Sequence, residues 1–481
     1  MIPNWLAQRT YLTPHKVALS YGNRQWTFLE MEQEAMRYAQ KLKTAGFSEG
    51  DRIALMGAST VEMVFIIHGC LLCGLEMVML NHRLTSEEIN WQIEDAEIKM
   101  VIFADQFNEK VGSLPIEKLS FSKLGQYDES SFAVIRNWDP RKTITIMYTS
   151  GTTGFPKGVR QTAENHTTSA LSSLLNLGLA EEDVWLCTMP LFHISGFSIL
   201  VRSIIYGMEV RLYEKFDAEK ATREIMAGSV TRMSVVTVML QQILAEMEKM
   251  NGFAHPNFKT MLAGGGAVPK DYLQRALNCH MPVLQTYGMT ETSSQTATLS
   301  AGDALRKIGS AGKPLFFNEI KIKDAVHANE HGEIYIKGPH VTPGYIGRYR
   351  DKQPLVDGWL PTGDIGYLDE EGYLYIVDRR SDLMISGGEN IYPAEIENSL
   401  AGHPKVREVG VCGKKHPKWG ETPVAFIVAD GEVSSDELLA FCKGRLANYK
   451  IPTEIVFVDA LPRNASNKLL RRELKEWLLS K

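Results

Sequence analysis

The sequence predicts an α/β protein with a large N-terminal domain of parallel-rich αβ sheets, a small β subdomain and a smaller α+β domain at the C-terminal end. Strand-like runs alternate with helical runs through the first part of the chain, which is typical of βαβ units. After about residue 310, short strands are separated by Gly, Pro and Asp turns. The length of 481 residues agrees with about three domain-sized units.

The N-terminal part supplies the βαβ pattern. The expected strands and helices, in order, are 52–56 and 61–73, then 100–103, then 209–212 and 218–227, then 232–236 and 240–249. The segment 63–80 is strongly apolar, but His68, Gly69, Gly74 and Glu76 interrupt it. It therefore predicts a buried helix and strand rather than a membrane span.

The C-terminal part changes character twice. Short strands are expected at 320–322, 332–337 and 373–377, and a charged turn follows at 378–382. Beyond that turn the expected elements are a helix at 394–400, strands at 408–412 and 424–428, a helix at 434–446, a strand at 455–458 and a helix at 469–479. We therefore predict an N-terminal domain at 1–380, with its β-rich subdomain at about 310–380, and a C-terminal domain at 381–481.

Composition excludes several classes of partner. The hydrophobic fraction of 44% is ordinary for a globular protein, and the net charge of −5 includes no basic block, so no nucleic-acid partner is expected. The N-terminus has no signal-peptide pattern, and no membrane insertion is expected. Six scattered cysteines, including a Cys70–Cys73 pair expected to pack in the core, suggest a cytoplasmic protein. The oligomeric state stays open, a homo-oligomer included.

A loop of hydroxyl residues and glycines follows the β-branched run 143–147. Glycines let several N–H groups converge on one anion, so the loop is suited to a polyphosphate. The candidate ligands are Thr149, Ser150, Gly151, Thr152, Thr153, Gly154 and Lys157. Pro156 precedes the lysine and Gly158 follows it, so this is not a Walker loop. A solvated turn is the alternative.

Three further segments have the residues of a nucleotide site. Glycines 264–266 end an apolar strand and could form a shelf for a base. Residues 287–291 supply an aromatic ring, a hydroxyl and a carboxylate, Glu291, which is a plausible magnesium ligand. Asp364 follows a turn, where its oxygens could accept from ribose hydroxyls. The alternatives are a packing turn, a buried Tyr with a surface Glu, and a turn cap.

Together these segments resemble the adenylate-forming superfamily of acyl-CoA synthetases, luciferases and peptide-synthetase adenylation domains, over essentially the full chain. The matching motifs are 148–158, 190–193, 287–291, 312–314, 362–364, 378–379, 387–397 and 462–468. The resemblance implies that 381–481 is a mobile lid domain with its hinge at Ser381. It also implies two half-reactions: a carboxylate attacks ATP to give acyl-AMP and pyrophosphate, and a thiol, usually of CoA, then displaces AMP.

The resemblance also implies residue roles and the cofactors ATP, Mg²⁺ and coenzyme A. Residues 149–157 would hold the β- and γ-phosphates. The other implied cofactor contacts are Gly265, Gly266, Ala267 and Tyr287 for adenine, Asp364 and Arg379 for ribose, and Gly387 and Gly388 for the pantetheine arm. Thr290 would contact the α-phosphate, and Glu291 would bind Mg²⁺. Lys468, carried by the lid, would stabilise charge that grows in the transition state.

Arg202 bears on the acyl substrate, because it lies in the strongly hydrophobic stretch 193–206. An unpaired buried guanidinium is costly, so it should meet an anion or reach solvent. It could therefore bind the second carboxylate of a diacid; a snorkelling arginine or an internal salt bridge is the alternative. His193, Ser234 and Thr237 are further pocket candidates, although His193 could equally be a core histidine.

Three segments, 288–295, 385–393 and 461–468, look like the 2-succinylbenzoate–CoA ligases of menaquinone biosynthesis, whose substrate is an aromatic dicarboxylate. The main alternative is a synthetase for another medium-chain or aryl acid. An adenylation domain that loads a carrier protein, a luciferase-like oxygenase and a nucleotide sensor are further alternatives. A kinase or P-loop hydrolase is disfavoured, because the Walker pattern is missing.

Overall fold

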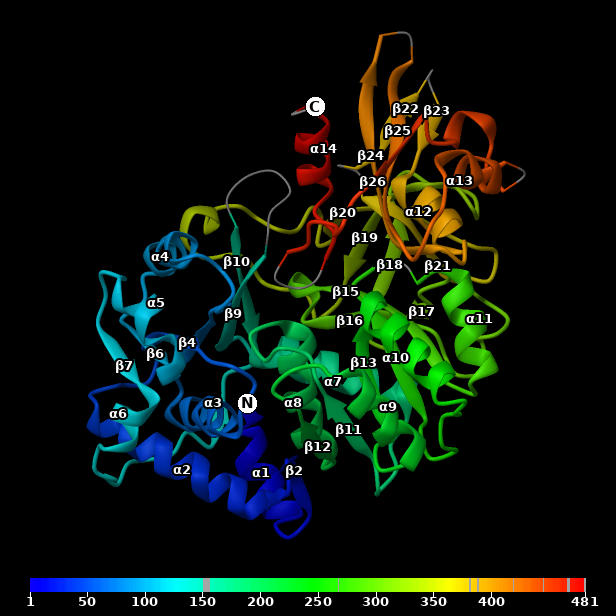
Figure 1. The fold of residues 1–481 in the computed structure, drawn as a ribbon. Helices are drawn as coiled ribbons and strands as arrows, with labels where there is room; N and C mark the ends of the chain where they lie inside the picture. Colours follow the sequence, from blue (N-terminus) through cyan, green and yellow to red (C-terminus); the bar gives the residue numbers. More distant parts are fainter. Residues whose placement is uncertain are drawn as a thin grey trace.

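The computed structural model describes residues 1–149, 156–266, 268–379, 382–386, 389–417, 419–443, 445–464 and 468–479, with the backbone alone at 379, 385, 389 and 390. Figure 1 shows a large N-terminal domain, coloured from blue to yellow-green, and a smaller C-terminal domain in orange and red above it. The α/β fold class predicted from the sequence is confirmed. Among the described residues, no helix is long and apolar enough to cross a bilayer.

A six-stranded sheet forms the first half of the large domain. Its order is β10 (Lys157–Thr162), β9 (Thr143–Thr149), β5 (Glu76–Met79), β4 (Arg52–Met56), β6 (Met100–Phe103) and β7 (Lys118–Ser120). All neighbours are parallel except β10, which returns antiparallel to β9. Helix α3 (Val61–Cys73) is buried, capped by Thr60 at its start and by Gly74 at φ 70° at its end. It packs against α2 (Phe28–Thr44).

A nine-stranded sheet forms the second half. Its order is β17 (Lys313–Pro314), β16 (Ser294–Thr298), β15 (Val283–Met289), β14 (Thr260–Gly264), β13 (Arg232–Val236), β11 (Val184–Cys187), β12 (Glu209–Leu212), β2 (Val17–Tyr21) and β3 (Arg24–Thr27). The strands from β15 to β2 are parallel. The accompanying helices are α7 (Ala163–Leu177), α8 (Ile194–Tyr206), α9 (Ala218–Ala227), α10 (Thr237–Lys249) and α11 (Lys270–Asn278). One apolar core cluster contains residues of both sheets, which makes them one domain.

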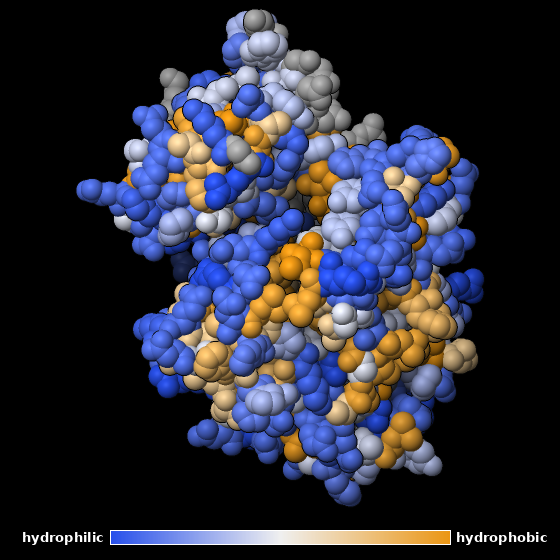
Figure 2. Space-filling model, turned by 90° about the vertical axis from the view of Figure 1, so that its right-hand side faces the viewer, coloured by the Kyte–Doolittle hydropathy of each residue, from blue (hydrophilic) through white to orange (hydrophobic). Residues whose placement is uncertain are grey.

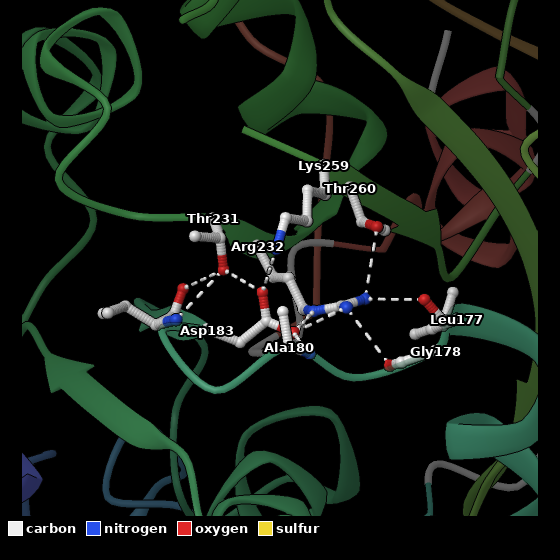
Figure 3. Close-up of polar contacts among 9 residues, drawn as sticks. Leu177, Gly178, Ala180, Asp183, Thr231, Arg232, Lys259 and Thr260 are labelled. Atoms are coloured by element: carbon white, nitrogen blue, oxygen red, sulfur yellow. Dashed lines mark hydrogen bonds and ion pairs between the residues drawn. The ribbon is translucent and has the colours of Figure 1, made fainter. Parts of the chain in front are cut away.

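A buried ion pair lies at the amino ends of the parallel strands β11, β13 and β14 (Figure 3). Arg232 donates to Asp183 Oδ2 from Nη2 at 2.8 Å, and Lys259 Nζ lies 3.0 Å from Asp183 Oδ1. Burial by itself raises the pKa of Asp183, but the amide of Ala180 and the Arg232 guanidinium outweigh it and hold that pKa below its ordinary value. The cluster fixes one end of the sheet and leaves the carboxyl ends for a site.

An antiparallel four-stranded sheet follows, made of β18 (Glu319–Ile322), β19 (Gly332–Lys337), β20 (Leu360–Leu368) and β21 (Leu374–Arg379). The C-terminal sheet contains β23 (Glu389–Ile391), β22 (Met384–Ser386), β25 (Gly420–Ala429), β24 (Val406–His416) and β26 (Glu454–Phe457). Its helices are α12 (Pro393–Ala401), α13 (Ser435–Cys442) and α14 (Arg471–Leu479). The shorter elements are β1 (Ile2–Pro3), α1 (Trp5–Leu12), α4 (Ser86–Asp95), η1 (Asp105–Phe107), α5 (Asn108–Gly112), α6 (Phe121–Gly125), β8 (Asn137–Trp138), η2 (Thr290–Thr292), η3 (Gly347–Tyr349) and η4 (Asn448–Lys450).

One arginine joins the two domains at their boundary. Arg471, the first residue of α14, lies 3.4 Å from Asp378 on β21, 2.9 Å from Asp382 and 2.6 Å from Glu397 on α12. Asp378 also accepts a hydrogen bond of 2.9 Å from the amide of Ala394. The last strand of the large domain is thus tied to the C-terminal domain through one carboxylate.

The surface carries an apolar hollow of about 270 Å³ beside α11, lined in part by Leu273, Leu277, Met281, Leu305 and Ile308. Figure 2 shows a smaller lobe above a larger one, with apolar side chains grouped in patches among charged ones.

Three expected helices differ from the structure by two or more residues at one end. Helix α10 begins at Thr237 rather than at residue 240. Helix α13 ends at Cys442 rather than at residue 446, because the backbone turns there and Lys443 forms a β-bridge with Leu446. Helix α14 begins at Arg471 rather than at residue 469, because Leu469 forms a β-bridge with Arg463. The Cys70–Cys73 pair is buried on α3, as expected for core residues, and burial raises the pKa of both thiols.

Candidate active site

The predicted phosphate loop leaves the sheet between β9 and β10. Thr149 lies opposite Lys157 in the antiparallel register, so the two ends of the loop meet. Ser150, Gly151, Thr152, Thr153 and Gly154 lie outside the described residues. The hairpin is anchored at its base, where the Tyr148 hydroxyl donates to Asp95 Oδ2 at 2.8 Å. Gly158 is needed there, since a Cβ would lie 2.5 Å from Ile346 Cγ1.

Lys157 and Glu291 come from distant segments but influence each other. Burial lowers the pKa of Lys157, and the negative charge of Glu291 opposes that shift. The Lys157 ammonium also lies 5.5 Å from the ring centroid of Tyr345. The structure therefore brings the cation of the predicted phosphate loop and the predicted magnesium carboxylate to one place.

Thr290 and Glu291 lie on the 3₁₀ turn η2, directly after β15. The Thr290 carbonyl accepts from Gln161 Nε2 at 2.9 Å, and the Glu291 carbonyl accepts from the Thr342 amide at 2.7 Å. The chain leaves the turn through Ser293 at φ 50° and Ser294 at φ 110°. Backbone of this kind costs free energy for residues with a Cβ and is concentrated at functional sites. The turn is thus held from outside at two successive carbonyls.

Tyr287 and Asp364 form the next pair. The Tyr287 hydroxyl donates to Asp364 Oδ2 at 2.6 Å, although 77 residues separate them. Asp364 is buried on β20, opposite Arg379 on β21 in the antiparallel register. The side chain of Arg379 lies outside the described residues. The residues predicted for adenine and for ribose are therefore adjacent.

The predicted shelf lies at the carboxyl ends of β13 and β14. Gly264 pairs with Val236 across these parallel strands. Gly265 and Gly266 follow, and a Cβ built on Gly266 would lie 4.0 Å from Thr237 Oγ1. Ala267 lies outside the described residues. Ligands of open α/β sheets bind at the carboxyl ends of strands, which is where these glycines are.

Arg202 is buried on α8, with 2% of its surface exposed. Its Nη2 donates to Ser294 Oγ at 3.0 Å, and its Nε has no hydrogen-bond partner in the described part of the chain. Its guanidinium carbon lies 5.4 Å from the ring centroid of Trp185, whose Nε1 donates to Ser234 Oγ at 3.2 Å. Burial lowers the pKa of Arg202. Among the described residues no carboxylate pairs with it, so the salt-bridge alternative finds no support there.

His193 precedes α8 and is half-buried rather than a core residue. Its ring centroid lies 4.6 Å from that of Phe192.

Lys468 is exposed in the segment between β26 and α14, which extends from the C-terminal sheet toward the large domain (Figure 1). Its amide donates to Asn464 Oδ1 at 2.8 Å, and its carbonyl accepts from the Asn464 amide at 2.8 Å. Gly387 and Gly388, like the hinge candidate Ser381, lie outside the described residues.

Sequence reasoning missed Gln161, Trp185 and Ser294. The polar Gln161 within a strand that faces the core was a usable signal. Trp185 and Ser294 gave none, because their partners lie far away in the chain.

The fold and the site define a nucleotide-binding enzyme class, and comparison with known families identifies it. The chain belongs to the family of AMP-binding enzymes: that family's model matches residues 6–346, and the model of the AMP-binding enzyme C-terminal domain matches residues 395–468. Curated relatives are named 2-succinylbenzoate–CoA ligases. One from Listeria monocytogenes is 48% identical over 98% of this chain and 99% of its own, and one from Geobacillus kaustophilus is 50% identical over 99% and 98%.

Solved structures of a related enzyme are also similar to this chain over nearly its full length. The o-succinylbenzoate CoA synthetase (MenE) from Bacillus subtilis in complex with its acyl-adenylate intermediate is 44% identical, covers 98% of both chains and superposes with a TM-score of 0.93. The same enzyme with ATP and a magnesium ion covers 98% of this chain and 99% of its own, with 44% identity and a TM-score of 0.92. A double mutant bound to the product analogue OSB-NCoA, also 44% identical over 98% of both chains, has a TM-score of 0.76. At equal identity, this chain is arranged more like the acyl-adenylate complex.

Proposed function

We propose that this chain is an AMP-forming acid–CoA ligase that converts 2-succinylbenzoate to 2-succinylbenzoyl-CoA in menaquinone biosynthesis. Membership of the AMP-binding family and the names of relatives at 48% and 50% identity support the reaction class and the substrate. The observation in this chain that supports the substrate is Arg202, a buried cation without a carboxylate partner among the described residues.

The substrate needs such a cation. Of its two carboxylates, one reacts with ATP and the other must be bound as an anion. A buried guanidinium with an unpaired Nε is expensive in the free protein, and a carboxylate that accepts from it removes that cost. Ser234, joined to the same cluster through Trp185, and His193 at the start of α8 complete the proposed pocket.

The nucleotide contacts follow the pairs described above. Thr149, the loop after it and Lys157 would hold the β- and γ-phosphates. Gly265, Gly266, Ala267 and Tyr287 would enclose adenine. Thr237, whose Oγ1 would lie 4.0 Å from a Cβ on Gly266, stays a candidate for the acyl pocket. Asp364 and Arg379 would bind the ribose hydroxyls, and Thr290 would contact the α-phosphate. The adjacency of Tyr287 and Asp364, and of Lys157 and Glu291, supports one continuous nucleotide site.

Glu291 fits the demands of Mg²⁺. That ion is usually bound through one or two carboxylates together with substrate phosphates, and keeps several waters. Glu291 supplies one carboxylate beside the proposed phosphate loop, and its backbone is fixed by Thr342. The ion, when bound with ATP, neutralises phosphate charge.

The reaction would proceed in two half-reactions. The substrate carboxylate attacks the α-phosphorus of ATP, the bond to the bridging oxygen breaks, and pyrophosphate leaves with acyl-AMP formed. The CoA thiolate then attacks the acyl carbon and AMP leaves. Lys468 would stabilise the negative charge that accumulates on the acyl and phosphate oxygens during the first step.

The domains 1–380 and 381–481 would turn about Ser381 between these steps, with Gly387 and Gly388 beside the pantetheine arm in the second. The difference between TM-scores of 0.93 and 0.76 supports two arrangements of the same parts. We expect a cytoplasmic enzyme, because all six cysteines are free and buried.

The test supplies a panel of acids together with ATP, Mg²⁺ and CoA and measures the rate of AMP formation for each acid. We expect 2-succinylbenzoate to exceed benzoate and octanoate in kcat/KM by at least about a hundredfold, since a site built for a charged group rejects analogues that lack it. Equal activity with benzoate or octanoate would overturn the substrate while leaving the ligase class. Release of ADP instead of AMP would overturn the class.

A further inference from the structure

Gln161 is a buried side chain that joins two parts of the proposed nucleotide site. It lies on β10, four residues after Lys157, with 0% of its surface exposed. Its Nε2 donates to the carbonyl of Thr290 at 2.9 Å, and its Oε1 accepts from Thr145 Oγ1 at 2.7 Å. It therefore connects the hairpin of the proposed phosphate loop to the turn that carries Thr290 and Glu291.

Which atom donates in each hydrogen bond around Gln161 follows from the groups involved. The Thr290 carbonyl can only accept, so the amide nitrogen of Gln161 must face it. The oxygen of Gln161 then takes the Thr145 proton, and the Thr145 oxygen accepts from His166 Nε2 at 2.8 Å. Burial lowers the pKa of His166 to about 3, so the ring is neutral. It donates to Thr145 in the tautomer that carries the proton on Nε2. Every acceptor in this series of hydrogen bonds has a donor only if residue 161 supplies an N–H or O–H group to the Thr290 carbonyl.

A second link between the same turn and β10 runs through Thr342, which lies outside that strand. The Thr342 amide donates to the Glu291 carbonyl at 2.7 Å, and the Thr342 hydroxyl donates to the Arg160 carbonyl at 2.6 Å. Arg160 and Gln161 are neighbours on β10. A turn of three residues has few hydrogen bonds of its own, so its position relative to β10 depends on these two contacts.

We propose that Gln161 is a positioning residue that sets the place of Thr290 and Glu291 relative to Lys157 without touching the nucleotide. This inference rests on the proposed function. When its amide is absent, the turn keeps one of its two ties to β10, and Glu291 shifts away from the phosphates that it must meet through Mg²⁺. A misplacement of about 1 Å at such a group can cost about a hundredfold in rate.

The first test measures binding. Gln161→Met keeps the length of the side chain and removes both polar atoms. We expect the Kd for Mg-ATP, measured by calorimetry without acid or CoA, to rise about tenfold, the cost expected when a buried hydrogen bond is lost. The Kd for ATP in EDTA should change less, because Glu291 acts through the ion. Unchanged Mg-ATP affinity would overturn the proposal.

The second test restores the donor chemically. Gln161→Glu keeps an acceptor for Thr145 and regains a donor to Thr290 only when its carboxyl is protonated. Burial raises the pKa of such a carboxyl, so Mg-ATP affinity relative to the wild type should recover as pH falls from about 8.5 to about 6. The titratable groups facing this site are His166, which is neutral in that range, Lys157 and Glu291. A constant ratio to wild type across this range would contradict the proposal.

The matched control is Asn318→Asp, which breaks another buried donation from a side-chain amide to a backbone carbonyl, that of Thr296, at 3.0 Å. Asn318→Asp should lower Tm and leave Mg-ATP affinity unchanged. If both variants weakened Mg-ATP binding equally, Gln161 would have only a structural role.

Adenylation should fall in Gln161→Met, while thioester formation from supplied acyl-AMP stays within about twofold. If the wild type binds Mg-ATP but ligates no acid, the proposed function fails while this inference stands.

Discussion

In the proposed acyl pocket, Arg202 is the residue whose burial is costly and whose charge would bind the substrate. It is buried, its Nη2 contacts Ser294, and its Nε lacks a partner among the described residues. We expect Arg202→Met to raise KM for 2-succinylbenzoate by between about tenfold and a hundredfold, the value of a hydrogen bond between charged groups. KM for ATP should stay within about twofold. Steady-state kinetics with each substrate varied in turn measure both; an equal rise in both constants would mean that Arg202 only supports the fold.

Lys468 tests the division of labour between the half-reactions. Its ammonium is proposed to act only while acyl-AMP forms, so Lys468→Ala should lower adenylation by at least about a hundredfold. Thioester formation from supplied acyl-AMP and CoA should be nearly unchanged. Single-turnover measurements of each step, with exposed Lys220→Ala as the control, separate the two. Equal loss in both steps would contradict the role given to this lysine.

At the scale of residues, the sequence identified segments better than partners. The loop at 148–158 and Glu291 could be found because their residue types are themselves the chemistry. The contact of Tyr287 with Asp364 could not, because it depends on how β15 and β20 are placed in different sheets. Gln161 itself could be noticed as a polar residue in a strand that faces the core, but its partner could not, because a backbone carbonyl carries no sequence signal.

At the scale of elements, the residues that stabilise the nine-stranded sheet and those of the proposed site lie at opposite ends of its parallel strands. Arg232 and Asp183 bind each other at the amino ends of the strands, while the glycine shelf lies at the carboxyl ends. Arg232→Met should lower the free energy of unfolding by about 3 kcal/mol, because it leaves a carboxylate buried with less compensation. Urea unfolding measures this. Arg223→Met, which breaks the exposed pair with Glu219, should cost less than about 0.5 kcal/mol. Similar losses in both variants would contradict this assignment.

The elements themselves were largely predictable. Strands β4, β6, β12 and β13 and helices α3 and α9 have the expected bounds, because each is a short apolar or amphipathic run with a clear start and end. In the large domain, α10 begins three residues before its expected start. In the C-terminal domain, the end of α13 and the start of α14 differ from the expectation. Helical periodicity continues at these two ends, but local β-bridges between Lys443 and Leu446 and between Arg463 and Leu469 take the residues instead.

At the scale of the molecule, three buried histidines make stability depend on pH. Burial lowers the pKa of His68 to about 4, and that of His166 and of His340 to about 3. The unfolded value is about 6.5. The folded state therefore binds fewer protons, so this contribution is fully present above about pH 6.5 and is lost progressively as pH falls toward the folded values.

We expect the free energy of unfolding to fall below pH 6.5, with each histidine contributing up to about 1.4 kcal/mol per pH unit. Urea titrations at several pH values between 7 and 5 measure the slope. His340→Gln should reduce the slope of the free energy of unfolding against pH by the contribution of one histidine. A free energy that is flat or rises as pH falls over this interval would contradict the expectation.

The joint at Arg471 has a consequence for chains cut short near their C-terminal end. Ending the polypeptide before α14 removes the guanidinium and leaves the acidic side chains of residues 378, 382 and 397 facing one another. Their mutual repulsion would push β21 and α12 apart, so a truncated enzyme would lose more than its last helix. The N-terminal domain would then keep the residues of the proposed nucleotide site but would no longer hold the C-terminal domain at a fixed angle.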